Sequence, residues 1–170
     1  MKEYFLKTDT PVANAIRRAA INRVRTLAID KVRVIENKTP YFDEFIAHRL
    51  GMIPIKTEGV PPENTEIILT LEAEGPWTVS TEDIQGEVEI PYKIPLFTLQ
   101  EGQRLRLELV VHSGYGRKHA KYQPCNAYYN IEKDGIRLFV EPYGQKDSDE
   151  ILKEAIEGLI GSLKELERLL

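Results

Sequence analysis

The sequence predicts an α+β protein. Apolar residues recur at helical spacing near both ends of the chain, while the region between them alternates like β-strands. No strand–helix–strand repeat of the kind that builds a parallel sheet is visible. We therefore expect a domain made from both chain ends, residues 1–30 and 126–170, with a β-rich second domain, residues 31–125, inserted into it.

The first predicted helix follows a short strand at residues 2–7. The hydroxyl of Thr10 can cap its first turn, and Pro11 suits the first helical position because no hydrogen bond is lost there. Arg17 and Arg18 lie at the edge of a narrow apolar stripe. A helix with so narrow a stripe needs a partner from its own chain or from another one. The stripe consists of Ala13, Ile16, Ala19, Ala20 and Val24.

The middle of the chain is predicted to be mostly strands. One short helix at residues 44–50, capped by Asp43 and ended by Gly51, interrupts them and places Phe45 inward. Alternation, β-branched residues and breaks at Gly and Pro predict strands at residues 26–35, 66–72, 77–80, 88–90, 94–99 and 104–112. Residues 128–132 and 136–141 then form a hairpin, in which Asp134 and Gly135 supply the positive φ angles of the turn.

The last predicted helix covers residues 148–170, with Ser148 as its cap and acidic side chains in its first turn. Its apolar stripe is wider than a single seam. The stripe includes Leu152, Ala155, Leu159, Leu163 and Leu166. One reading is that this stripe only covers the sheet of its own domain. We favour a helix that covers the sheet with one side and meets a second subunit with the other, because such a patch is a liability when exposed.

Composition narrows the classes of function. The chain has 170 residues, a net charge of −4 and no apolar run long enough to span a membrane. Its N-terminal residues lack the apolar region of a signal peptide, so we expect a cytoplasmic protein. Residues 1–33 carry eight basic and three acidic side chains, whereas residues 147–170 carry three basic and seven acidic ones. These opposite charges are either two solvated helix faces or a means of orienting an assembly.

Residues for catalysis or metal binding are not apparent. His48, His112 and His119 share no ligand spacing, and we expect no metal site and no cofactor. Neither a hydrolase triad nor a glycine-rich phosphate loop is recognisable. Cys125 is the only cysteine, and we expect it to be packed rather than reactive.

A basic stretch at residues 116–122 has two readings. It could bind nucleic acid, with Tyr115 and Tyr122 stacking on bases and Arg117, Lys118 and Lys121 contacting phosphates. It could instead be an ordered loop whose cations contact acidic residues of a neighbour. We favour the second reading because the chain as a whole is acidic.

Several collinear motifs carry a family resemblance. They include PVANAIRR at residues 11–18, TLAID at 26–30, AHRLGMIPI at 47–55, EGQRL at 101–105 and KHAKYQP at 118–124. Together these motifs resemble the larger alpha-like subunit of archaeal RNA polymerase. That family is similar to the third-largest subunit of eukaryotic RNA polymerase II and to the amino-terminal domain of the bacterial alpha subunit. The resemblance covers nearly the whole chain.

The resemblance implies an alpha-subunit-like dimerisation domain and a non-catalytic assembly role in a DNA-directed RNA polymerase. Such a protein pairs with a smaller alpha-like subunit, or with itself when isolated, and then docks the large beta-like subunit and small polymerase subunits. No direct contact with DNA, RNA or a membrane is expected. The expected pairing residues are Ala13, Ile16, Ala20, Val24, Leu152, Ala155, Leu159, Leu163 and Leu166. The residues expected to dock the large subunit are Arg17, Arg18, His48 and Arg49.

Two departures from the family pattern are expected. Many relatives have a further strand before residues 2–7, and many have a third domain, in some cases with iron–sulfur clusters. Here the hairpin at residues 128–141 stands in place of that domain, and one cysteine cannot hold a four-iron cluster. The alternative function is an autonomous nucleic-acid-binding module that uses the loop at residues 115–122.

Overall fold

The computed structural model describes residues 1–170, which form two compact units. Unit 1 consists of residues 1–26, 57–60 and 115–170. Unit 2 consists of residues 27–56 and 61–114. The units therefore divide after Thr26 and Gly114, and residues 57–60 belong by their contacts to unit 1.

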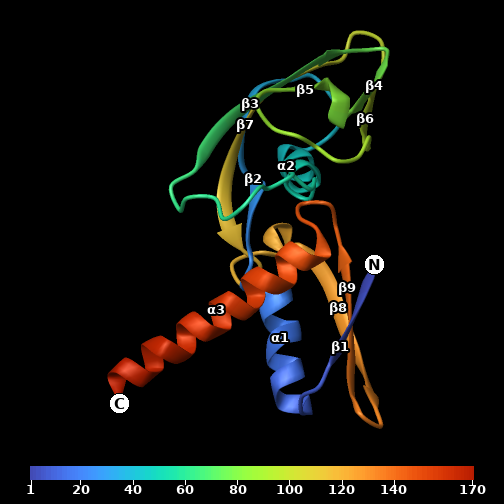
Figure 1. The fold of residues 1–170 in the computed structure, drawn as a ribbon. Helices are drawn as coiled ribbons and strands as arrows, with labels where there is room; N and C mark the ends of the chain where they lie inside the picture. The colour runs from blue at the N-terminus through green and yellow to red at the C-terminus, as the bar shows by residue number, and fades with distance from the viewer. The chain divides into compact units, whose positions relative to one another are not determined.

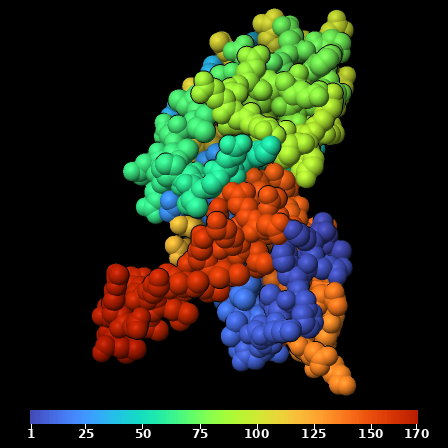
Figure 2. All heavy atoms as spheres, in the orientation of Figure 1, coloured from blue at the N-terminus to red at the C-terminus, as the bar shows by residue number.

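Unit 1 is a three-stranded antiparallel sheet covered on one face by two helices (Figure 1). The strand order is β1 (Lys2–Leu6), β9 (Gly135–Pro142), β8 (Cys125–Glu132), so the first strand of the chain pairs with the last. The helices are α1 (Thr10–Asn22) and α3 (Ser148–Leu169). Figure 2 shows the C-terminal part of α3 extending beyond the other atoms of this unit.

Small side chains form much of the core of unit 1. Ala19, Ala20 and Val24 of α1 and the turn after it pack on Cys125 and Ala127 of β8, which lets the helix lie close to the sheet. The remaining buried members of this core are Leu138, Val140, Ile151, Leu152 and Ala155. The narrow stripe of α1 is therefore covered by its own chain.

Each long helix is capped by the residue before the predicted one. Asp9, not Thr10, accepts a hydrogen bond from the backbone N–H of Val12 at 3.4 Å. Asp147, not Ser148, accepts one from the N–H of Glu150 at 2.9 Å. In each case an aspartate precedes the hydroxyl residue, and its carboxylate is an equally good N-cap.

The β8–β9 hairpin has a turn that differs from the predicted one. Glu132 pairs directly with Gly135, and Asp134 does not have a positive φ. Gly135 is required for space, because a Cβ there would lie 2.6 Å from the carbonyl oxygen of Leu6 in β1. Close pairing with the first strand therefore favours glycine at this position.

Unit 2 combines two antiparallel sheets with one helix. The first sheet has the order β2 (Arg25–Asn37), β7 (Arg104–Tyr115), β3 (Glu66–Glu74), β5 (Ile84–Gln85). The second pairs β4 (Trp77–Ser80) with β6 (Pro95–Leu99). The helix is α2 (Asp43–Gly51).

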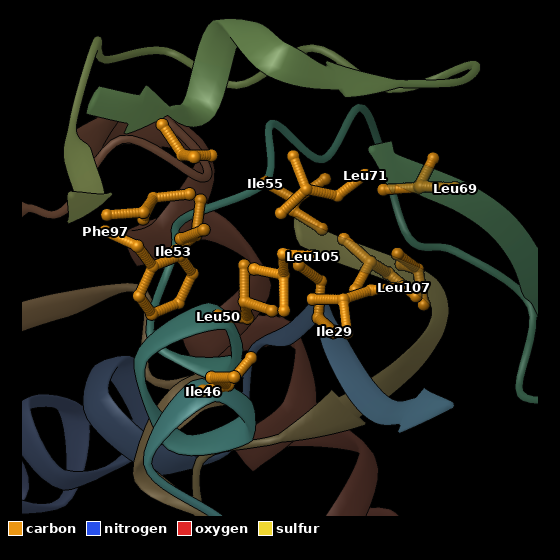
Figure 3. Packing of buried hydrophobic residues seen from close by; sticks show 14 of the residues in the cluster. Ile29, Ile46, Leu50, Ile53, Ile55, Leu69, Leu71, Phe97, Leu105 and Leu107 are labelled. Carbon is orange, nitrogen blue, oxygen red and sulfur yellow. The ribbon is translucent and has the colours of Figure 1, made fainter. Parts of the chain in front are cut away.

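The core of unit 2 follows the alternation seen in the sequence. Leu105, Leu107 and Leu109 of β7 are buried and point to one side of the sheet. Ile46 and Leu50 of α2 pack among them, as Figure 3 shows. The predicted strand pattern of this region therefore holds where apolar alternation is longest.

Four expectations for unit 2 were wrong. Residues 88–90 form no strand, because the segment around them pairs with no neighbouring strand. Asp43 lies inside the first turn of α2 and does not cap it, and Gly51 is the last helical residue rather than the residue after the helix. Phe45 is 47% exposed, and its ring contacts Tyr41 and Phe97 at the edge of the core.

A buried lysine ties residues 57–60 to α3. The side chain of Lys146 has no exposed surface, and its ammonium group donates to the carbonyl oxygen of Gly59, to Glu154 and, at 3.3 Å, to Glu150. Burial raises the pKa of Glu154 above its usual value, although Lys146 acts to lower it. Removing one partner of such a buried ion pair leaves an unpaired charge in the interior and strongly destabilises the fold.

We expect Lys146→Met to lower the free energy of unfolding by about 3–5 kcal/mol, because it leaves Glu154 buried without its cation. Because the pKa of Glu154 is higher in the folded chain than in the unfolded chain, the folded chain binds more protons at this residue at pH values just above 4.5. Protonation of Glu154 therefore favours the folded state as the pH falls into this range. The unfolding free energy lost in Lys146→Met, measured by urea unfolding, should therefore be smaller at pH 5 than at pH 8. Adding Glu154→Gln should remove that pH dependence, and equal losses at both pH values would contradict the assignment.

Candidate interaction surfaces

The second half of α3 has no cover from its own chain. From Glu157 onward every residue except the half-buried Leu159 is exposed. Leu163 is 65% exposed and Leu166 is 54% exposed. Both continue, at helical spacing, the face on which Leu152 and Ala155 are buried. One apolar stripe therefore packs on the sheet in the first turns of α3 and is open in the later turns.

The structure divides the predicted pairing residues into three groups. Ala13, Ala20, Val24, Leu152 and Ala155 are buried within unit 1 and offer no surface to a partner. Ile16 and Leu159 are half-buried at the edge of the core. Only Leu163 and Leu166 are exposed, and Ile160, Leu169 and Leu170 are exposed beside them.

Three arginines surround a hollow between α1 and α3. Arg18, Arg23 and Arg117 line it together with Ala15, Ala19, Asn22 and Leu159, and its volume is about 310 Å³. Arg23 donates to the hydroxyl of Ser162 at 2.5 Å. Arg17, the neighbour of Arg18, instead donates to Asn14 at 3.0 and 3.2 Å and does not line the hollow.

The basic stretch at residues 116–122 cannot stack on bases as the nucleic-acid reading requires. Tyr122 is fully buried. Tyr115 has the guanidinium carbons of Arg25 and Arg117 at 4.8 and 5.0 Å from its ring centre. Its hydroxyl accepts a hydrogen bond from Arg25 at 2.6 Å. Both aromatic rings are therefore engaged within the chain.

On unit 2, α2 and its flanking residues present an apolar face that the sequence analysis missed. Phe42 is 79% exposed, and Phe45 and Met52 are each nearly half exposed. The spacings of three and seven residues place them on one helix face, and this pattern was the available signal. His48 is also exposed, whereas Arg49 donates to the carbonyl oxygens of Leu96 and Pro95, both at 2.8 Å. Arg49 therefore fastens α2 to β6.

No three His, Cys, Asp or Glu residues are placed to hold a metal ion. Cys125 is buried with its sulfur 3.6 Å from the carbonyl oxygen of Ala20, and burial raises its pKa to about 12. As the only cysteine it cannot supply the four thiolates of an iron–sulfur cluster, so such a cluster does not fit this chain.

His112 links neighbouring strands of unit 2 through both of its ring nitrogens. Its ring nitrogens lie 3.1 Å from Asp30 and 3.2 Å from Glu66. These two carboxylates belong to β2 and β3, on either side of β7.

None of the helices has the length and apolar character needed to cross a bilayer.

Comparison with known proteins assigns the family. Residues 28–130 match the RNA polymerase Rpb3/RpoA insert domain. The DNA-directed RNA polymerase subunit Rpo3 of Methanocaldococcus jannaschii is 46% identical over 156 residues, which cover 90% of this chain and 81% of that protein. The chain belongs to the Rpb3/RpoA family. Its mixed α/β architecture, with mostly antiparallel sheets and three helices, agrees with the predicted fold class.

Other Rpb3/RpoA relatives are considerably longer than this chain. Rpo3 of Thermococcus kodakarensis is 41% identical over 132 residues, covering 71% of this chain and 51% of that protein. Rpo3 of Pyrococcus horikoshii is 39% identical over 128 residues, covering 69% and 49%. The chain thus matches only about half the length of these two family members.

We expect Arg49→Met to lower the free energy of unfolding by about 1–3 kcal/mol, because two carbonyl oxygens of β6 lose a charged donor. The neighbouring substitution His48→Ala removes an exposed side chain and should change it by less than about 0.5 kcal/mol. Urea unfolding of the two variants measures both values. Equal stabilities would show that Arg49 has no structural role.

We also expect the Cys125 thiol to react with Ellman's reagent at pH 8 at least about 100-fold more slowly in the folded chain than in 6 M guanidinium chloride, since it is buried and protonated. The absorbance of the released thiolate measures both rates. Fast reaction under native conditions would contradict the packing of Cys125 against α1.

Proposed function

We propose that this chain is a non-catalytic assembly subunit of a cytoplasmic DNA-directed RNA polymerase. It pairs with a smaller alpha-like subunit, and the pair forms a platform on which the large subunits, which carry the active site, dock. Membership of the Rpb3/RpoA family supports the polymerase context. The single observation that carries the assembly role is the open apolar stripe on the second half of α3.

The proposed pairing surface is narrower than the one expected from the sequence. It consists of Leu163 and Leu166, with Leu159 and Ile160 at its inner end and Leu169 at its outer end. Full burial of one leucine side chain is worth about 1.5–3 kcal/mol, so a partner helix along this stripe gains enough to offset the cost of ordering it. The buried residues of α1 act indirectly, because they hold α1 against the sheet.

The large beta-like subunit is proposed to dock on the exposed face of unit 2 formed by Phe42, Phe45, His48 and Met52. Aromatic residues and methionine are enriched in the centres of protein interfaces. Arg49, expected from the family resemblance to dock directly, positions this face by holding α2 on β6. Arg17 is held by Asn14, so Arg18 is the docking candidate that remains on α1.

A nucleic-acid-binding module is not supported by the contacts. The two tyrosines that would stack on bases are buried or held between arginines. The net charge of −4 also opposes binding to a polyanion.

The pairing surface is tested by placing a charge in the stripe. We expect Leu163→Asp and Leu166→Asp each to weaken pairing with the smaller alpha-like subunit by at least about 100-fold, because each buries an unpaired carboxylate. Both residues are exposed in the single chain, so its thermal unfolding midpoint should stay within a few degrees of the parent. Analytical ultracentrifugation of the mixed subunits measures the affinity.

Lys164→Asp is the matched control, since it makes a larger charge change away from the stripe on the same helix turn. It should leave pairing unchanged. If the leucine variants pair as tightly as the parent chain, the stripe is not the pairing surface and the proposed function loses its support.

A further inference from the structure

A groove on unit 2 lies against the two-stranded sheet of β4 and β6 and has a volume of about 860 Å³. Part of its lining is apolar and part is acidic, the acidic part coming from the 3₁₀ turn at Thr81–Asp83. None of its lining residues belongs to α2, so the groove is distinct from the apolar face proposed to dock the large subunit. The apolar lining includes Pro76, Trp77, Pro95 and Leu99, and the acidic lining consists of Glu82 and Asp83.

Trp77, the only tryptophan of the chain, is held at one edge and open on its face. Its side chain is 56% exposed, although it is the largest apolar group in the groove. The indole N–H donates to the carboxylate of Asp83, with Nε1 at 3.3 and 3.4 Å from the two oxygens. Neither a cation nor another aromatic ring of the chain lies on the indole. The ring is therefore fixed in the groove with its face available to a partner.

The Asp83 carboxylate beside this ring has no cation of its own. It accepts hydrogen bonds from the backbone N–H and the hydroxyl of Ser80, at 2.7 and 3.3 Å, and belongs to no ion pair. Lys93 also lines the groove, but its ammonium group pairs with Glu82, and both of those side chains are largely exposed. Residues 72–92 carry six acidic side chains and no basic one, so the surrounding chain adds further negative charge. The groove is therefore complementary to a positively charged group.

We infer that this groove binds an arginine side chain on a segment of another protein. The guanidinium group stacks on the open face of Trp77 and donates to the carboxylate of Asp83. Tryptophan is the aromatic ring that attracts a cation most strongly, and a planar guanidinium group can stack on a ring and pair with a carboxylate at the same time. The apolar walls at Pro76 and Pro95 accommodate the aliphatic stem of the arginine. This surface lies on a different unit from the α3 stripe, and the inference does not depend on the proposed pairing.

Other occupants fit the groove less well. A nucleic-acid backbone carries negative charge and is repelled by the acidic lining. A purely apolar side chain that covered Trp77 would bury Asp83 without a counter-charge, which is costly. Lysine supplies the charge, but its compact ammonium group is more strongly hydrated and cannot stack as a plane on the indole.

The test uses Trp77 as its own reporter, because a chain with one tryptophan gives one indole N–H resonance in an NMR spectrum. The ¹⁵N-labelled full chain is titrated with a blocked pentapeptide that has one central arginine between serine and glycine residues. We expect a saturable shift of the indole resonance. A peptide with citrulline, which has nearly the same shape but no charge, should bind at least about tenfold more weakly, and a lysine peptide should lie between the two.

Variants assign the binding to the groove. We expect Asp83→Asn to weaken binding of the arginine peptide by about tenfold, because an amide still accepts from Ser80 but carries no charge. Glu87→Gln is the matched control, since it removes one exposed charge from the same acidic segment outside the groove, and it should bind like the parent. Trp77→Leu should weaken binding similarly, followed by the backbone resonance of Thr78. The exposure of Trp77 means that its thermal unfolding midpoint should change by only a few degrees.

Several outcomes would overturn the inference. Citrulline and arginine peptides that bind equally would show that charge is not recognised, and an Asp83→Asn variant that binds like the parent would remove the carboxylate from the site. If spermidine shifts the indole resonance as strongly as the arginine peptide, the groove takes a free polyamine rather than a protein side chain. These results leave the proposed function untouched, because that function is judged by subunit pairing of the Leu163→Asp variant.

Discussion

α3 is longer than the surface of unit 1 on which it packs, and this difference leaves the second half of its apolar stripe uncovered. The helix has 22 residues, but its fully buried side chains end at Ala155. Beyond that point it makes few contacts with its own unit, and isolated helical turns are marginal in water. Gly158 and Gly161 lower helix stability further, by about 1 kcal/mol each relative to alanine. A Cβ at either glycine would meet no atom of the chain, so packing within the chain does not explain them.

Unit 1 depends on contacts between the two ends of the sequence. β1 pairs with β9, and Tyr4 lies opposite Leu138. The hydroxyl of Tyr4 also donates to Asp149 at the start of α3. Because these partners are far apart in the chain, the platform for α3 forms only after long-range pairing. The sheet on which α3 packs, and with it the exposed stripe that extends beyond the sheet, is therefore formed only in the folded chain.

The predictable features were those with a long periodic pattern. The alternation along β7 and the leucine spacing of α3 each extend over many residues, and both elements formed as expected. The helix caps moved by one residue because Asp9 and Asp147 stand directly before the hydroxyl residues that were chosen. Whether the apolar stripe of α1 is covered by its own chain or by a partner could not be predicted. Small alanine side chains allow the close approach of a strand as readily as that of a helix. The hollow was beyond sequence reasoning, because Arg18 and Arg117 are brought together only by the fold.

In the proposed pairing, the exposed stripe of α3 supplies affinity but does not fix the register of a partner helix. Leucines spaced along a helix give affinity, but they tolerate a shift of the partner by one turn, because the apolar contact looks similar after each turn. The proposed assembly role therefore requires contacts beyond the stripe that fix the register of the partner helix, because a platform for further subunits is useful only when its two halves meet in one arrangement.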